Sequence, residues 1–127
     1  MPSKREHNAA AFKHLRAYRV TVAAFPEWGA VMLFYSALHV LESLFAAEQI
    51  HCPDHSRREL YIKTTHKKIW PSYHRLQTES AKARYLQGGA FSMNASMVKK
   101  ELWKQKYRDI RQYVRSQQRS TLFGGQQ

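Results

Sequence analysis

The chain has 127 residues, of which 43% are hydrophobic and 13% aromatic, so it is long enough for one core and too apolar to be intrinsically disordered. Its one cysteine, Cys52, excludes an internal disulfide framework, and the polar start from Met1 to His7 argues against a secretory signal. The formal net charge of +12 favours polyanionic partners. These features predict a single domain over residues 1–127 in the cytoplasm.

The first two helices are predicted on either side of Pro26. Apolar residues recur at helical spacing over residues 4–24, and this helix should end near Phe25 because proline disfavours helix in the residue before it. Pro26 suits the start of a second helix, whose apolar run from Trp28 to Phe45 covers nearly all faces. The run is long enough to raise the question of a membrane span, but it contains histidine, serine and glutamate. A buried core helix, and no membrane contact, is therefore predicted.

Two further helices are marked by capping residues and by proline and glycine. Either Asp54 or Ser56 can cap a third helix that runs to about Lys68. A fourth helix should restart at Pro71 and continue at three- or four-residue apolar spacing until the Gly88-Gly89 pair.

The last helix is predicted to start at a cap on Asn94 or Ser96 and to carry one apolar stripe, with most of its basic residues on other faces. The tail from Gln117 to Gln127 is predicted to be frayed and disordered. No segment alternates with period two for long enough to form a strand, and the short loops favour antiparallel neighbours. The predicted fold is all-α, an up-and-down bundle of four or five helices.

Positive charge is concentrated towards the two ends of the chain. Residues 1–19 carry five basic side chains against one carboxylate, and residues 95–119 carry eight against two. Clustered lysines and arginines attract polyanions, so this pattern predicts a nucleic-acid-binding surface, although charged faces that only keep the protein soluble would look alike. The predicted nucleic-acid-binding residues are Lys99, Lys100, Lys104, Arg108, Arg111, Arg115, Lys13 and Arg16.

A metal site is not predicted, and neither is any other cofactor. His51, Cys52 and His55 lie in one loop, but a structural zinc site needs four ligands and no second pair matches. Phosphate-binding loops and nucleophile motifs are also absent from the sequence. The loop histidines are interpreted as polar residues near a helix start.

Histidine, arginine and tyrosine residues in the middle of the chain could carry metal-free phosphate chemistry. Tyr35 and His39 share a helix face, His55 and Arg58 lie three apart, and Arg84 ends the fourth helix. A histidine can move the proton of a ribose 2′-hydroxyl while an arginine holds the phosphate. Structural roles are the alternatives: His39 as a hydrogen-bonded core histidine, and Arg84 as the ion-pair partner of a carboxylate such as Glu42 or Glu79.

The sequence between Trp28 and Tyr85 resembles the small bacterial HEPN-like domains. It reads W-G-A-V-M-L-F-Y-S-A-L-H-V-L-E-S-L-F, then H-C-P-D-H-S-R-R, then Y-H-R-L-Q-T-E-S-A-K-A-R-Y, over about half of the chain. The matching positions are Tyr35-Ser36-Ala37-Leu38-His39 with Glu42, His55 with Arg58, and Ser80 with Ala83-Arg84-Tyr85. The resemblance implies a helical bundle, frequent homodimers, and roles in RNA cleavage, toxin–antitoxin pairs and defence against mobile elements.

Active members of that family use an arginine followed after four to six residues by a histidine, at a dimer cleft, for metal-independent RNA cleavage. Here the nearest pair is Arg58 and His66, eight positions apart. On one helix these two would share a face, a little over two turns apart.

Three functions follow as hypotheses. The first is a nucleic-acid-associated HEPN-like binding or assembly subunit, with RNA as the expected partner, that forms a homodimer or joins a larger complex in a defence, toxin–antitoxin or mobile-element system. The second is a metal-independent endoribonuclease at a dimer cleft. The third is a protein-interaction domain that docks an acidic partner. Candidate catalytic residues for the second are His55, Arg58, His66 and Arg84.

Overall fold

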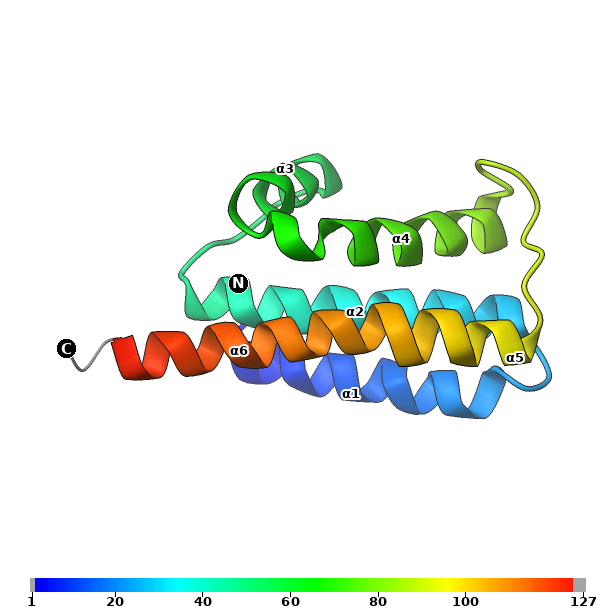
Figure 1. Cartoon of the computed structure of the whole chain (residues 1–127), viewed down its shortest axis with the longest axis horizontal. Helices are drawn as coiled ribbons and strands as arrows, with labels where there is room; N and C mark the ends of the chain where they lie inside the picture. The colour runs from blue at the N-terminus through cyan, green and yellow to red at the C-terminus, as the bar shows by residue number, and fades with distance from the viewer. Residues whose placement is uncertain (1, 125–127) are drawn as a thin grey trace.

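The computed structural model describes the backbone of residues 2–124 and the side chains of residues 2–119. Its long helices are α1 (Lys4–Thr21), α2 (Pro26–Ala47), α4 (Trp70–Tyr85) and a continuous helical rod of α5 (Ala95–Met97), η2 (Val98–Tyr107) and α6 (Arg108–Gly124). Successive long helices run in opposite directions (Figure 1). No strand occurs within the described backbone. The predicted all-α, up-and-down bundle is therefore confirmed.

The corner between α1 and α2 is tight. Ser3 caps α1 reciprocally with Glu6 in a capping box, and α1 ends at Thr21, slightly earlier than predicted. A Cβ atom on Gly29 would lie 2.9 Å from the Cα and Cβ atoms of Val22. Glycine at this position therefore lets the start of α2 pack directly on the chain that leaves α1.

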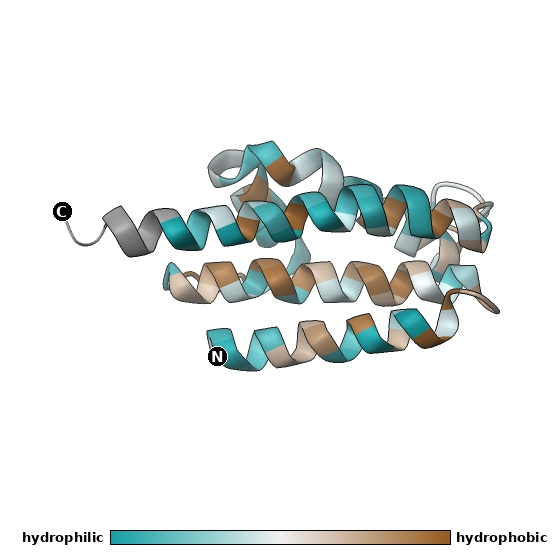
Figure 2. Ribbon diagram, turned by 60° about the horizontal axis from the view of Figure 1, so that its bottom comes forward, coloured by the Kyte–Doolittle hydropathy of each residue, from teal (hydrophilic) through white to brown (hydrophobic). Residues whose placement is uncertain are grey.

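Helix α2 is the centre of the bundle and packs against α1, α4, η2 and α6. Among the described residues it is the one helix long and apolar enough to cross a membrane by length and composition, and 67% of its most apolar window is buried inside the bundle. Figure 2 shows the contrast between the hydrophobic residues of α2 and the hydrophilic ones along α6. The Ser36 hydroxyl donates to the Ala11 carbonyl at 2.7 Å and lies 2.8 Å from the Tyr107 hydroxyl, which ties α1, α2 and η2 together.

The short helix α3 (His55–Thr65) and the 3₁₀ turn η1 (Lys67–Ile69) lie between α2 and α4. Asp54, not Ser56, caps α3 by accepting a hydrogen bond from the Arg57 amide at 2.8 Å. The helix was expected to reach about Lys68 but ends at Thr65. His66 leaves the helical conformation to bond with side chains of the rest of the bundle, and the chain then tightens into η1.

The C-terminal rod departs from the prediction in two ways. Asn94 caps it as one of the two predicted candidates, by accepting from the Met97 amide, but the turns of η2 are π-helical, wider than α-helical ones. The helix also continues through Gln117 to Gly124, where a frayed tail was expected. No glycine or proline interrupts the chain between Arg108 and that point. The last part of the predicted tail, residues 125–127, lies outside the described residues.

Candidate functional site

A polar stripe on α2 links this helix to three others. Tyr35, His39 and Glu42 follow one another at four- and three-residue spacing and so lie on one face of α2. Each contacts a different element: Tyr35 bonds α4, His39 bonds α1 and Glu42 bonds α3. The segments that contain His39, Arg58 and Arg84, on which the HEPN-like resemblance rests, are therefore in direct contact in the fold.

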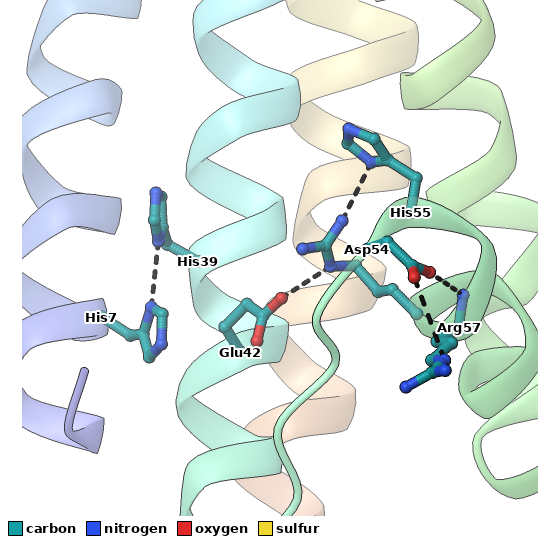
Figure 3. Close-up of polar contacts among 7 residues, drawn as sticks. His7, His39, Glu42, Asp54, His55 and Arg57 are labelled. Carbon is teal, nitrogen blue, oxygen red and sulfur yellow. Dashed lines mark hydrogen bonds and ion pairs between the residues drawn. The ribbon is translucent and has the colours of Figure 1, made fainter. Parts of the chain in front are cut away.

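The Glu42 carboxylate holds Arg58 in a nearly buried ion pair. Arg58 Nε lies 2.6 Å from Glu42 Oε1, and the two side chains are only 12% and 7% exposed. Figure 3 labels Glu42 and draws this contact as a dashed line. Burial lowers the pKa of Arg58, but its hydrogen bond to Glu42 and the Glu42 charge outweigh burial and raise it. This arginine is a fixed cation with a dedicated partner.

Arg58 in turn orients His55. Its guanidinium nitrogen lies 3.0 Å from His55 Nδ1 (Figure 3). Because a guanidinium only donates hydrogen bonds, Nδ1 must accept, and the proton of the neutral imidazole is on Nε2. Glu42 therefore positions Arg58, and Arg58 selects the tautomer in which exposed His55 offers an Nε2–H donor.

Arg84 is held by aromatic residues and not by a carboxylate. One guanidinium nitrogen donates to the Tyr35 hydroxyl, and its central carbon lies 5.3 Å from the Tyr35 ring centre and 4.5 Å from that of Tyr85. Glu42 and Glu79, which were considered as partners for Arg84, pair instead with Arg58 and Lys82. Arg84 Nε is buried and has no hydrogen-bond partner among the described side chains.

A groove of about 540 Å³ brings His55 and Arg84 to one surface. Its wall is formed by α3 and α4, and Phe34 of α2 contributes to its lining. Sequence reasoning missed several polar groups of this lining, because nothing in the local pattern distinguishes them from ordinary surface residues. The additional polar lining residues are Glu59, His74, Gln77, Thr78 and Gln87.

His66 is not part of this groove. It is 3% exposed, its Nε2 lies 3.0 Å from Glu48 Oε1 and its Nδ1 lies 2.6 Å from the Tyr113 hydroxyl. Its ring also packs against Phe45 and Tyr61. The structure thus does not join His66 to Arg58. Both of its ring nitrogens are used to fix α2, η1 and α6 against one another.

Three histidines from α1 and α2 form a cluster that sequence reasoning also missed. His7 Nδ1 lies 3.1 Å from His39 Nδ1, and the His14 ring stacks on the His39 ring at 5.5 Å between centres. Burial, then the neighbouring His7 and His14, lower the pKa of His39, and burial followed by the charge of Lys13 lowers that of His14. His39 is therefore partly buried and bonded to a side chain, the structural role considered from the sequence.

The loop with His51, Cys52 and His55 does not gather its side chains. Cys52 is buried, whereas His51 and His55 are exposed. Burial raises the pKa of the Cys52 thiol, and the Glu42 charge raises it further. Among the residues that the structure describes, no group of three or more His, Cys, Asp or Glu side chains could hold a metal ion.

The basic residues of the C-terminal rod form an exposed surface. Trp103, Tyr107, Arg108, Arg111 and Arg115 line a depression of about 220 Å³. The pKa of Tyr107 is raised by burial, and this rise is partly offset by its hydrogen bond with Ser36 and by the charges of Arg111, Arg115 and Arg19 of α1. Lys99, Lys100 and Lys104 are exposed on η2.

The two carboxylates of the rod are turned to other partners. Glu101 pairs with Arg75 at 3.1 Å, and Asp109 accepts a hydrogen bond from Ser72 at 3.2 Å. None of the ion pairs found among the described side chains involves a cation of η2 or α6. The arginines around Trp103 are therefore free of carboxylate partners in this part of the structure.

Lys13 and Arg16, the predicted nucleic-acid contacts of α1, lie on a different surface. They line an open groove on α1 with Phe12 and Val20, which are 58% and 82% exposed. The eight basic residues that were predicted to bind nucleic acid therefore do not line one continuous surface.

Comparisons with protein-family models, with curated proteins and with solved structures find no match to this chain. The class defined by fold and site together is an all-α bundle with a basic helical face and a separate polar groove.

Proposed function

We propose that this protein is an RNA-binding helical bundle, a HEPN-like binding or assembly subunit, whose basic η2–α6 surface contacts the phosphate backbone. The observation that carries the proposal is the group of Arg108, Arg111 and Arg115, which share one depression beside Trp103 and have no ion-pair partner among the described side chains. RNA is the expected polymer because of the HEPN-like sequence pattern, and a homodimer or a larger complex is its expected assembly.

The chemistry of this surface supports phosphate binding. Planar guanidinium groups form paired hydrogen bonds with phosphate oxygens, and each neutralised phosphate releases counterions. An aromatic ring beside them offers a face on which an unpaired base can stack. A surface of this kind binds single-stranded RNA with little sequence preference and with a strong dependence on salt.

The test is fluorescence anisotropy with a labelled single-stranded RNA and the matching DNA over a series of salt concentrations. The variant Arg108→Gln/Arg111→Gln/Arg115→Gln should bind RNA more weakly and should lower the slope of log K against log salt by about 2, at about 0.7 for each lost phosphate contact. The matched control is Arg57→Gln/Lys67→Gln/Lys68→Gln, which removes the same charge from exposed positions of α3 and η1. The proposal fails if wild type shows no binding at low salt, or if both triple variants lose affinity equally.

Metal-independent RNA cleavage is a second candidate, favoured by the presence of His55 and Arg84 in one groove. Arg58, which is nearly buried, would act there only by positioning His55. Cleavage that survives a chelator, leaves cyclic-phosphate ends and disappears in His55→Ala would establish this activity. Intact RNA after long incubation with the pure protein would exclude cleavage and leave RNA binding as the proposed function.

A further inference from the structure

Helix α1 lies at the edge of the bundle and packs mainly against α2. Figure 1 shows it on the side of α2 that faces away from α4. The buried residues of α1, which are Ala11, Leu15 and Tyr18, face the bundle. Residues on the opposite side of the helix, such as Phe12 and Arg16, are exposed. One long face of α1 is therefore open to a partner.

The exposed face of α1 carries an open groove of about 580 Å³. Its lining forms two rows of residues at four-residue spacing, which are Ala9-Lys13-Ala17 and Phe12-Arg16-Val20. Side chains four positions apart on a helix align into ridges, and the groove between two ridges can receive a ridge of another helix. The small alanine side chains in the first row allow such a helix to approach closely. The face therefore has the relief of a helix-packing surface.

Exposed apolar residues are concentrated in this part of the chain. Of the nine large hydrophobic residues that are exposed in the described structure, four lie between Phe12 and Trp28. Phe12 and Val20 are both more than half exposed and lie two turns of α1, about 12 Å, apart. An amphipathic helix that places its apolar side on this groove would remove both side chains from water, which stabilises a complex.

Two cations lie between the apolar residues of the groove. Lys13 and Arg16 occupy the middle of the two rows, and neither has an ion-pair partner among the described side chains. A partner that covered them without supplying carboxylates would leave buried and unpaired charges, which is strongly unfavourable. The partner must therefore carry aspartate or glutamate among its apolar residues.

Other occupants of the groove fit these charges less well. The α1 face of a second copy presents the same cations, and Glu6, the one acidic residue of α1, already bonds Ser3 in the capping box. Residues 120–127 of the chain itself contain no aspartate or glutamate. Helices that lie on membranes separate their charged and apolar faces, whereas Lys13 and Arg16 lie between apolar residues.

We propose that the exposed face of α1 docks an acidic amphipathic helix of another protein, with apolar residues of that helix on Phe12 and Val20 and its carboxylates on Lys13 and Arg16. The spacing of the groove predicts apolar residues at positions i and i+7 of the partner helix and carboxylates at i+3 and i+4. This surface is separate from the η2–α6 surface, and the interaction does not depend on RNA binding there.

Fluorescence anisotropy of the full chain with two labelled synthetic peptides tests this surface. The acidic peptide is an alanine-rich helix with leucine at i and i+7 and glutamate at i+3 and i+4, and the basic peptide has lysine in place of glutamate. Wild type should bind the acidic peptide about tenfold or more tightly than the basic one, because opposite charges select the partner. Phe12→Ser/Val20→Ser should weaken binding of the acidic peptide by about tenfold or more, because the apolar contacts are lost.

Charge reversal provides the sharpest control. Lys13→Glu/Arg16→Glu should bind the basic peptide in preference to the acidic one. The matched variant Lys99→Glu/Lys100→Glu reverses two charges at exposed positions of η2, outside the groove, and should keep the preference for the acidic peptide. Amide chemical shifts upon addition of the acidic peptide should change at the residues that line the groove. The proposal is overturned if wild type binds the two peptides equally or not at all, or if the two charge-reversal variants behave alike.

The same α1 variants distinguish the other occupants. Loss of RNA binding in Lys13→Glu/Arg16→Glu would assign this face to RNA. Loss of binding to phosphatidylserine vesicles in Phe12→Ser/Val20→Ser would assign it to a membrane, and conversion of a dimer to a monomer in that variant, measured by light scattering, would assign it to a second copy. Any of these three results in place of the peptide preference overturns the proposal. Retained binding of the acidic peptide in the triple arginine variant of α6, with RNA binding lost, would separate this surface from the proposed RNA-binding one.

Discussion

Arg58 of α3 and the arginines of α6 have the same charge but different surroundings. Arg58 is nearly buried, bonded to Glu42 and to His55, whereas Arg108 and Arg115 are exposed and have no ion-pair partner among the described side chains. A buried and paired guanidinium has used its donors within the fold. An exposed and unpaired one has them available for a ligand. The difference separates an arginine that positions other residues from arginines that can bind phosphate, although all of them look alike in the sequence.

The largest effect on stability is expected at Arg58. Arg58→Ala leaves the Glu42 carboxylate nearly buried and unpaired, which should lower the free energy of unfolding by about 3–5 kcal/mol in urea denaturation. The double variant Glu42→Gln/Arg58→Met removes both charges and should lose much less. A loss below about 1 kcal/mol in the single variant would show that Arg58 contributes no more to stability than an exposed arginine does.

Ser36 allows the same comparison between a buried, hydrogen-bonded side chain and an exposed one, here for an uncharged residue. Ser36→Ala removes the hydroxyl that joins the Ala11 carbonyl to the Tyr107 hydroxyl and leaves both without this partner. The expected loss of unfolding free energy is about 1–3 kcal/mol, measured by thermal or urea unfolding. The exposed Ser96→Ala is the matched control and should change stability by less than about 0.5 kcal/mol.

The histidine cluster should make stability depend on pH. Folding lowers the pKa of His14 and His39 below the ordinary value of 6.5, so the unfolded chain binds protons more readily than the folded one. The groups that face His39 are His7, His14, Glu42 and Arg58, of which only Glu42 favours its protonation. The unfolding free energy should therefore be highest above pH 6.5, fall as the pH drops through that value, and level off below the folded pKa values.

Urea unfolding of wild type and His14→Gln/His39→Gln between pH 7.5 and 5 measures this effect. The double variant should show a flatter profile, and His74→Gln, at an exposed position of α4, should retain the wild-type slope. Equal slopes in all three proteins would contradict the assignment.

The smallest effect on stability is expected for Arg108→Gln/Arg111→Gln/Arg115→Gln. These side chains have no ion-pair partner to lose among the described residues, and removal of three charges reduces repulsion in a chain of net charge +12. The free energy of unfolding should change by no more than about 0.5 kcal/mol, whereas the proposed RNA binding should weaken. A loss of several kcal/mol would instead indicate a structural role for this surface.

The helices could largely be predicted from the sequence because their limits depend on local chemistry. Pro26 starts α2, and Asp54 and Asn94 cap α3 and α5 by hydrogen bonds to nearby amides. The end of α3 was predicted wrongly because His66 responds to Glu48 and Tyr113, which are distant in sequence. The π-helical turns of η2 have no local sequence signal.

The candidate site could be predicted only in part. The spacing of Tyr35 and His39, and of His55 and Arg58, correctly places each pair on one helix face. Which arginine pairs with Glu42 depends on how α3 and α4 pack against α2, and this is a tertiary property. The contacts of His7 and His14 with His39 were missed for the same reason.

The wide turns of η2 also affect how the chain tolerates insertions and deletions. A π-helical turn accommodates an additional residue, so loss of one residue between Val98 and Tyr107 can be absorbed as the turn tightens to α-helical width. Loss of one residue within α6 cannot be absorbed in this way, because its turns already have α-helical width, and would rotate the following part of the helix by about 100°. Natural length variation in this rod should therefore fall in η2, where it leaves the arginines of α6 facing outward.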